Sequence, residues 1–321
     1  MLKRLFDSKN KKKSIVSLGG GTGQFYLLSG LKEYVGNNLE IKAIVTTLDN
    51  GGSSGKLITH FGVLPPGDIR NCLVALSDES KILNELFQYR FDEKLDSHNF
   101  GNLLLTALND VTGSFDKAVK VASRILRIKG EVVPVSLKNN NLVAELEDGR
   151  KLIGETLIDT TPDKKIVKLS LQEKPITNKR AIEVLNNADL IVFGPGDLYS
   201  SILPNVLFPK VREAIRNNKK AKKILIAPVM SKPGETDDFD ISDIVKEIEK
   251  YLNSKIDLVV VNSHVPTSLA LKEYRKENKH PVSLDEENLK SYKIIKGNFI
   301  DEDKLVRHNP QKLAKALVEL L

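Results

Sequence analysis

Two glycine-rich loops near the start of the chain have the composition of phosphate-binding loops. The first is Gly19-Gly20-Gly21-Thr22-Gly23, directly after an apolar run. Glycine lets a backbone approach a ligand closely, and a helix that begins at such a loop presents free N–H groups and the positive end of its dipole. The dinucleotide fingerprint G-x-G-x-x-G/A fails, because its sixth position is Gln24 when counted from Gly19 and Tyr26 when counted from Gly21. An NAD-dependent dehydrogenase is therefore the weaker alternative to another phosphate-binding protein, and a purely structural turn is a third reading.

The second loop, Asp49-Asn50-Gly51-Gly52-Ser53-Ser54-Gly55-Lys56, follows the next apolar run. It resembles a P-loop but is not one, since that pattern requires Gly where Asn50 stands and Ser or Thr where Leu57 stands. Backbone donors, two serine hydroxyls, a carboxylate and an ammonium group suit a pyrophosphate, with a divalent cation such as Mg²⁺ as a candidate cofactor. We expect Lys56 to contact phosphate as a point charge. The alternative is a surface loop without a ligand.

Two further polar segments supply candidate ligand contacts. Asp68, Arg70 and Asn71 follow a Pro-Pro-Gly turn, where Asp68 is placed to cap a helix. His98 and Asn102 belong to the polar segment Ser97–Asn102, which precedes an apolar helical stretch. Each has a structural alternative, helix capping for Asp68 and packing for His98. If a metal ion is bound, Asp49 and Asp68 are the candidate ligands.

The second half of the chain repeats the arrangement. Gly194-Pro195-Gly196-Asp197-Leu198-Tyr199-Ser200-Ser201 follows a buried strand, and we take Gly194, Gly196 and Ser200 as ligand contacts. The polar loop Pro228–Thr236 follows another strand. Several such loops together carry more weight than each alone, because open α/β sheets bind ligands at the carboxyl ends of their strands.

The elements that must position these loops alternate along the chain. Short apolar runs predict strands, and segments of helical periodicity lie between them, which is typical of a Rossmann-like, doubly wound α/β fold with a mostly parallel sheet. The predicted strands are Ser14–Leu18, Ile41–Thr47, Leu190–Phe193, Ile224–Ala227 and Leu258–Val261. The predicted helices are Phe25–Tyr34, Lys179–Asn186, Val206–Arg216, Ile241–Leu252 and Ser268–Lys276.

The middle of the chain has a different pattern. Four strand-like runs follow one another with no helix between them: Val132–Val135, Leu142–Leu146, Lys151–Ile153 and Ile166–Leu171. Asp148-Gly149 predicts a tight hairpin turn. We therefore expect an antiparallel insertion or sheet extension over residues 132–171, within a single continuous α/β domain that spans residues 1–321.

Composition limits the partners. The net charge is +7, but the lysines are scattered and no aromatic residues interleave them, so we expect no nucleic-acid partner. No apolar run reaches the ~18 residues of a membrane span. Cys72 is the single cysteine, which excludes an intramolecular disulfide, and it lies in an apolar helical stretch where a buried, inert thiol is expected.

Several segments together resemble the gluconeogenesis factor family, bacterial relatives of the 2-phospho-L-lactate transferases of deazaflavin cofactor synthesis. The matching stretches run in order along almost the whole chain. They are GGGTG (Gly19–Gly23), DNGGSSGKL (Asp49–Leu57), PPGDIRN (Pro65–Asn71), FQYRF (Phe87–Phe91), GNLLLTAL (Gly101–Leu108), GPGDLYSSILPN (Gly194–Asn205), PGET (Pro233–Thr236) and VRHNP (Val306–Pro310).

The resemblance implies a cytoplasmic, regulatory protein that binds a UDP-sugar of the UDP-N-acetylglucosamine type without turning it over. It implies a role in cell shape and peptidoglycan balance during gluconeogenic growth, with cell-wall synthesis proteins and a second copy of the chain as candidate partners. It also implies that Tyr274 and Arg307 contact the uridine end of the ligand. The alternative is a 2-phospho-L-lactate transferase-like enzyme acting on a nucleotide diphosphate adduct. Asn50 stands where many relatives carry a second Asp, which weakens a metal-assisted transfer.

Overall fold

The centre of the fold is a parallel β-sheet. The structure is a computed structural model that describes residues 12–36, 38–161, 165–302 and 305–321. Seven strands lie in the order β10-β9-β8-β7-β1-β2-β3, and every neighbouring pair is parallel. They are β1 (Lys13–Gly19), β2 (Leu39–Val45), β3 (Glu131–Pro134), β7 (Leu190–Phe193), β8 (Lys222–Ile226), β9 (Leu258–Asn262) and β10 (Lys293–Gly297). The predicted doubly wound α/β fold is confirmed.

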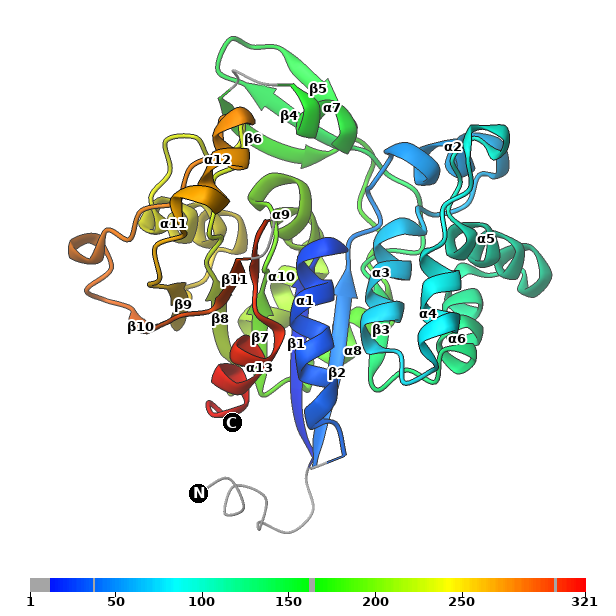
Figure 1. The fold of residues 1–321 in the computed structure, drawn as a ribbon, viewed down its shortest axis with the longest axis horizontal. Coiled ribbons are helices and arrows are strands. Elements are labelled where there is room, and N and C mark those ends of the chain that lie inside the picture. Colours follow the sequence, from blue (N-terminus) through cyan, green and yellow to red (C-terminus); the bar gives the residue numbers. More distant parts are fainter. Residues whose placement is uncertain (1–11, 37, 162–164, 303–304) are drawn as a thin grey trace.

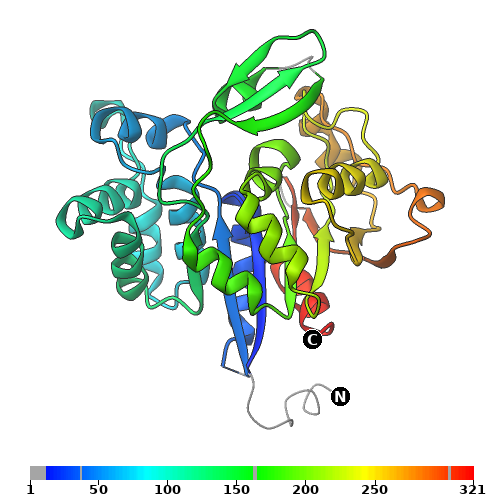
Figure 2. The same cartoon turned by 180° about the vertical axis from the view of Figure 1, so that it is seen from behind.

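Helices cover both faces of this sheet, as the two opposite views show (Figures 1 and 2). One face packs against α1 (Thr22–Leu31), α3 (Gly67–Leu76), α6 (Phe115–Ile125) and α13 (Pro310–Val318), with α2 (Gly52–Phe61), α4 (Lys81–Gln88) and α5 (Phe100–Thr112) on the same side of the molecule. The other face packs against α8 (Lys179–Asn186), α9 (Leu203–Val206), α10 (Pro209–Asn217) and α11 (Ile241–Leu252). None of the described helices is long and apolar enough to cross a membrane.

The central strands β1, β7, β8 and β9 are mostly apolar because both of their faces are buried over most of their length. In β1, Ile15 packs into the core on the α1 side, whereas Val16 and Leu18 pack into the core on the α10 side. Side chains of a strand alternate between its two faces, so a run of apolar residues serves both cores. This is why these strands could be predicted from short apolar runs.

The antiparallel part is smaller than the sequence predicts. Strands β4 (Leu142–Leu146), β5 (Lys151–Ile153) and β6 (Ile166–Leu171) form a three-stranded antiparallel sheet in the order β5-β4-β6. The run predicted at Val132–Val135 lies instead at the edge of the main sheet as β3, parallel to β2. This part of the prediction was wrong because β3 follows α6 as one more strand–helix crossover, which a short apolar run alone does not reveal. That the chain is one continuous domain stays a prediction.

A helix also interrupts the antiparallel strands, against our expectation. Helix α7 (Glu155–Thr160) lies between β5 and β6. It has six residues, of which only Ile158 is buried, so it leaves no helical period in the sequence. In Figure 1 this helix and its sheet lie above the carboxyl edge of the main sheet.

The order of the strands fixes where a ligand can bind. The chain leaves β1 toward β2 and β3 and later returns to place β7 on the other side of β1. The carboxyl ends of β1 and β7 therefore form the topological switch point, where open α/β sheets bind ligands. Near this edge lie α12 (Ser268–Lys276) and a small hairpin of β11 (Ile300–Glu302) and β12 (Val306–His308).

Candidate functional site

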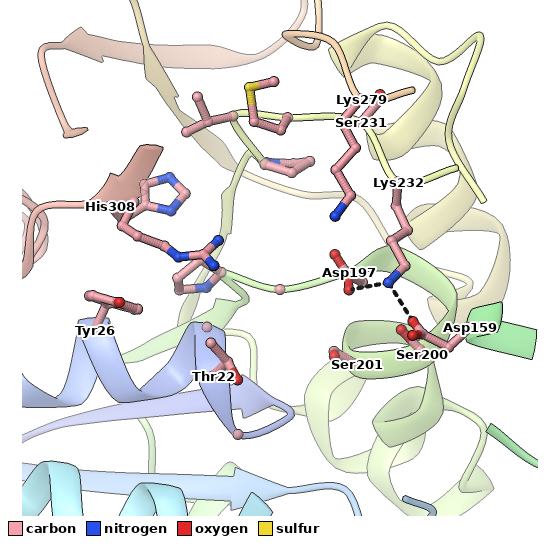
Figure 3. Close-up of a pocket in the computed structure, with 18 of the residues that line it drawn as sticks. Thr22, Tyr26, Asp159, Asp197, Ser200, Ser201, Ser231, Lys232, Lys279 and His308 are labelled. Atoms are coloured by element: carbon pink, nitrogen blue, oxygen red, sulfur yellow. Dashed lines mark ion pairs between the residues drawn. The ribbon is translucent and has the colours of Figure 1, made fainter. Parts of the chain in front are cut away.

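A cavity of about 470 Å³ lies at the switch point, and Figure 3 shows its walls. Seven parts of the chain, far apart in sequence, contribute to it. Its lining residues include Gly21, Thr22, Gly23 and Tyr26 after β1, Asp49 after β2, Asp68 on α3, Glu155 and Asp159 on α7, Gly196, Asp197, Ser200 and Ser201 after β7, Ser231 and Lys232 after β8, and Tyr274, Lys279, Arg307 and His308 near the C-terminus.

One wall has the features of an anion site. Helix α1 begins at Thr22, and its N-cap residue Gly21 makes no side-chain cap hydrogen bond. The first turn of an α-helix leaves N–H groups without partners inside the helix, and the helix dipole adds partial positive charge there. Ser200 and Ser201 lie in a π-helical turn, Leu198–Ile202, on the same cavity. Hydroxyls and N–H groups together suit a phosphate.

The glycines of the first loop have a reason that the sequence did not indicate. A Cβ at Gly23 would lie 2.0 Å from the carbonyl oxygen of Pro195, and one at Gly21 would lie 2.4 Å from Oδ1 of Asp68. A Cβ at Gly20 would lie 2.9 Å from Oγ of Ser201. Packing of the neighbouring loops is therefore a sufficient reason for glycine at these positions. Close approach of a ligand to them stays a prediction.

Carboxyl groups form a second wall, which adjoins the first at Asp68 beside Gly21. Asp49 and Asp68 meet Glu155 and Asp159, which α7 brings over the cavity. Burial raises the pKa of Glu155 to about 8, and the charges of Asp49, Asp159 and Asp68 add to the effect. Burial and the charge of Asp49 raise the pKa of Asp68 to about 7. Both groups therefore hold protons close to neutral pH, which reduces repulsion of a phosphate.

The sequence suggested that Asp68 caps its helix, but in the structure Pro66 is the N-cap residue of α3. Asp68 lies in the first turn of α3 without a cap hydrogen bond to that helix, and it accepts a hydrogen bond from the backbone N–H of Gly21. Asp49 accepts a hydrogen bond from Gly51 N–H at 2.8 Å, and burial raises the pKa of Asp49. Among the described residues, no three acidic, His or Cys side chains converge as metal ligands, so Asp49 and Asp68 stay a candidate pair only.

Three cationic side chains also line the cavity. Lys232 Nζ lies 2.6 Å from Asp159 Oδ1 and 3.6 Å from Asp197 Oδ2 (Figure 3). Burial opposes its charge, but these two carboxylates outweigh that effect and raise the pKa of Lys232 to about 12. Lys279 pairs with Glu277 at 2.6 Å. Arg307 is exposed and pairs with no carboxylate in the part of the chain that the structure describes.

Nine of the predicted contacts line the cavity: Gly21, Thr22, Gly23, Asp49, Asp68, Gly196, Ser200, Tyr274 and Arg307. Others lie outside it. Lys56 donates a hydrogen bond to the carbonyl oxygen of Asp96 at 2.8 Å, away from the cavity. Asn50 Oδ1 accepts hydrogen bonds from the backbone N–H and the hydroxyl of Thr156, both at 2.9 Å, and so ties the second loop to α7. Gly20 and Gly194 pack beside the cavity rather than lining it.

The remaining predicted contacts do not line the cavity and hydrogen-bond to one another or to nearby backbone instead. Ser53 Oγ lies 3.1 Å from His98 Nδ1 and 3.2 Å from Asn102 Nδ2. Ser54 Oγ accepts a hydrogen bond from Gly67 N–H at 3.2 Å. Arg70 donates to Asn71 Oδ1 at 2.9 Å. In the structure these side chains support the second loop and the starts of α3 and α5.

Several cavity residues were not predicted. Tyr26 lies on α1, which was predicted to begin at Phe25, but the residue was not selected. Glu155 and Asp159 lie on α7, where no helix was expected. Lys232 and Ser201 belong to polar loops that were recognised, but neither was selected. The only signal in the sequence for these two residues was that their loops follow predicted strands. Which side chain points inward depends on loop conformation, which short motifs do not encode.

Replacing Lys232 should weaken binding of an anionic ligand, whereas replacing Lys56 should not. We expect Lys232→Ala to cost about 2 kcal/mol of binding free energy, because it removes a charged donor and leaves two carboxylates unpaired beside the ligand. Lys56→Ala should change binding by less than about 0.5 kcal/mol, since Lys56 is an exposed residue outside the cavity. Calorimetry with UDP-N-acetylglucosamine measures both. The reverse order of effects would place the phosphate at the second loop.

Comparisons with known proteins give a family match, similar sequences and a similar protein of known structure. The profile of the family described as 2-phospho-L-lactate transferase CofD matches residues 15–300. A relative from Aquifex aeolicus is 44% identical over 97% of each chain, and the gluconeogenesis factor of Bacillus subtilis is 40% identical over 97% of this chain and 99% of its own. A crystal structure of a UPF0052 family protein from Bacillus halodurans has a TM-score of 0.91 at 38% identity and covers 96% of this chain and all of its own.

Proposed function

Because the chain belongs to the CofD family of 2-phospho-L-lactate transferases and to its gluconeogenesis factor relatives, we propose that its cavity binds a nucleotide diphosphate sugar of the UDP-N-acetylglucosamine type. One observation carries the proposal. The start of α1, two serine hydroxyls and three cationic side chains line a single cavity at the topological switch point. Such a set suits a diphosphate, and the carboxyl groups that also line the cavity suit the hydroxyls of a sugar.

We further propose that binding regulates the protein rather than feeding a reaction, and that the regulated process is cell-wall synthesis during gluconeogenic growth. The gluconeogenesis factors among its relatives support this choice. So does Asn50, which is engaged with Thr156 and supplies no second carboxylate beside Asp49. A ligand that stays intact can act by bridging the start of α1 and the Lys232–Asp159 ion pair, which joins the loop after β8 to α7.

The second candidate is a transferase that moves a phospholactyl-type group from a nucleotide diphosphate adduct. The family match favours it. Phosphoryl-type transfer depends on positioning and charge neutralisation, so it does not require a nucleophile from the protein. Asp49 and Asp68 would hold a divalent cation, which would neutralise phosphate charge. Their raised pKa values mean that a cation would have to displace protons first.

Calorimetry on the purified protein tests the proposal. UDP-N-acetylglucosamine, UDP, GDP and NAD⁺ are titrated with Mg²⁺ and again with EDTA. The regulatory proposal expects the UDP-sugar to bind best and to be recovered unchanged after long incubation. Binding that needs Mg²⁺, together with release of a nucleoside monophosphate or transfer of the group, would favour the transferase. Absence of binding by every nucleotide would overturn both.

A further inference from the structure

The cavity contains an aromatic ring that nothing in the sequence singled out. Tyr26 lies on α1 and is half-buried. It is four residues beyond Thr22, so both side chains project from the same face of the helix, and long helical side chains lean back toward the N-terminus. In Figure 3 Tyr26 lies above the helix on the left of the cavity, with Thr22 one turn earlier. The ring therefore lies about one helical turn, ~5.4 Å, from the anion site.

Tyr274, the aromatic residue expected to stack on a base, is engaged elsewhere. Its side chain is only 5% exposed, and its hydroxyl donates a hydrogen bond to the carbonyl oxygen of Val306 at 2.8 Å. Val306 begins β12, the strand that carries Arg307 and His308 into the cavity. Tyr274 is therefore a positioning residue for that strand, because so little of its ring is free to cover a ligand.

Tyr26 has the freedom that Tyr274 lacks. No described residue forms a hydrogen bond with its hydroxyl, and the Phe25 ring meets it edge to face with ring centroids 5.8 Å apart, which leaves a face of the Tyr26 ring uncovered by that contact. His308 lies on the same side of the cavity in Figure 3, across from Lys232 and Asp159. Arg307, from the same strand as His308, is exposed and unpaired among the described carboxylates.

We propose that Tyr26 is the base-stacking residue of this site. The heteroaromatic base of the nucleotide lies on the Tyr26 ring, the ribose fills the turn between Tyr26 and Thr22, and the diphosphate lies at the start of α1. Arg307 closes over the base from the opposite side, as guanidinium groups do on planar rings. This inference rests on the proposed nucleotide site and deepens it.

The test compares Tyr26→Ala with Tyr26→Phe by calorimetry, using UDP and UDP-N-acetylglucosamine. Stacking on an aromatic side chain contributes about 1–3 kcal/mol per base, so Tyr26→Ala should weaken both ligands about 5- to 150-fold. Tyr26→Phe keeps the ring and should stay within about 2-fold of wild type, because one hydroxyl without a protein partner contributes little. Proton NMR of bound UDP adds a direct readout, since uracil protons shift upfield over a ring in wild type and in Tyr26→Phe only.

Phe25→Leu provides the matched control, because Phe25 is the neighbouring aromatic residue and does not line the cavity. Equal loss of affinity in Phe25→Leu and Tyr26→Ala, or unchanged affinity in Tyr26→Ala, would overturn the stacking role while nucleotide binding by wild type stood. If wild type bound no nucleotide at all, the proposed function and this inference would both fail. Displacement of UDP by riboflavin would assign the slot to a flavin-like ring instead.

Discussion

Gly23→Ala should abolish nucleotide binding and lower the free energy of unfolding by about 3 kcal/mol or more. The added Cβ would lie 2.0 Å from the carbonyl oxygen and 2.6 Å from the carbonyl carbon of Pro195. Both are backbone atoms, so no side-chain rotation relieves the contact. The loops after β1 and β7 would have to separate, and their junction is the anion site. Urea unfolding and calorimetry measure the two effects.

Gly51→Ala is the matched control for this change. Gly51 precedes α2 with an ordinary negative φ of −91°, and a Cβ there would meet the hydroxyl of Thr156 at 3.1 Å. Asp49 Oδ1, at 3.3 Å, is the other close atom, and both are side-chain atoms that can give way slightly, so we expect a loss of stability below about 1 kcal/mol. A folded Gly23→Ala protein with the stability of wild type would show that the two loops do not pack as closely as described.

The parts of the fold that the sequence predicted are those set by local pattern. Leu190–Phe193, Lys179–Asn186, Ile241–Leu252 and Ser268–Lys276 were predicted at the bounds that the structure gives to β7, α8, α11 and α12. Each is an apolar run or an amphipathic period between turn residues. Burial in the core of the sheet enforces the pattern in β7, α8 and α11, whereas α12 packs on the β11–β12 hairpin. By contrast, the strand that begins at Glu131 was assigned to the antiparallel part but belongs to the main sheet. Which sheet a strand joins depends on packing between distant segments, and the local sequence pattern does not contain that information.

The sequence predicted the location of the candidate site more accurately than it predicted the side chains that line it. Loops after β1, β2 and β7 do border one cavity, because the carboxyl ends of parallel strands meet at one edge. Lys56 shows what the pattern could not decide. Helix α2 already begins at Gly52, so Lys56 lies more than one turn inside it, and its side chain reaches Asp96, which is 40 residues away in sequence. Resemblance to a P-loop is resemblance of composition, whereas phosphate contact depends on where the helix starts.

Raising the pH from 5 to 8 should destabilise the ligand-free protein, and Glu155→Gln should remove much of that loss. The ordinary pKa is 4.5 for the Glu155 carboxyl and 3.8 for Asp68, and in the fold burial raises these values to about 8 and about 7. At pH values between the ordinary and the raised pKa of each group, the native state binds more protons than the unfolded state. Stability therefore falls as the pH rises, by at most about 1.4 kcal/mol per pH unit for each group, and the fall ends above the folded pKa values.

The measurement is urea unfolding at intervals across this pH range, with and without UDP-N-acetylglucosamine. Glu155→Gln keeps the shape of the side chain and holds it neutral, so its stability at pH 8 should exceed that of wild type and its slope should be shallower. Glu173→Gln is the control, because Glu173 is exposed outside the cavity and its exchange should leave the slope unchanged. If wild-type stability were flat from pH 5 to 8, the carboxyl wall would already be ionised at neutral pH. A diphosphate would then have to bind beside several negative charges, and a divalent cation between them would become a requirement of the site.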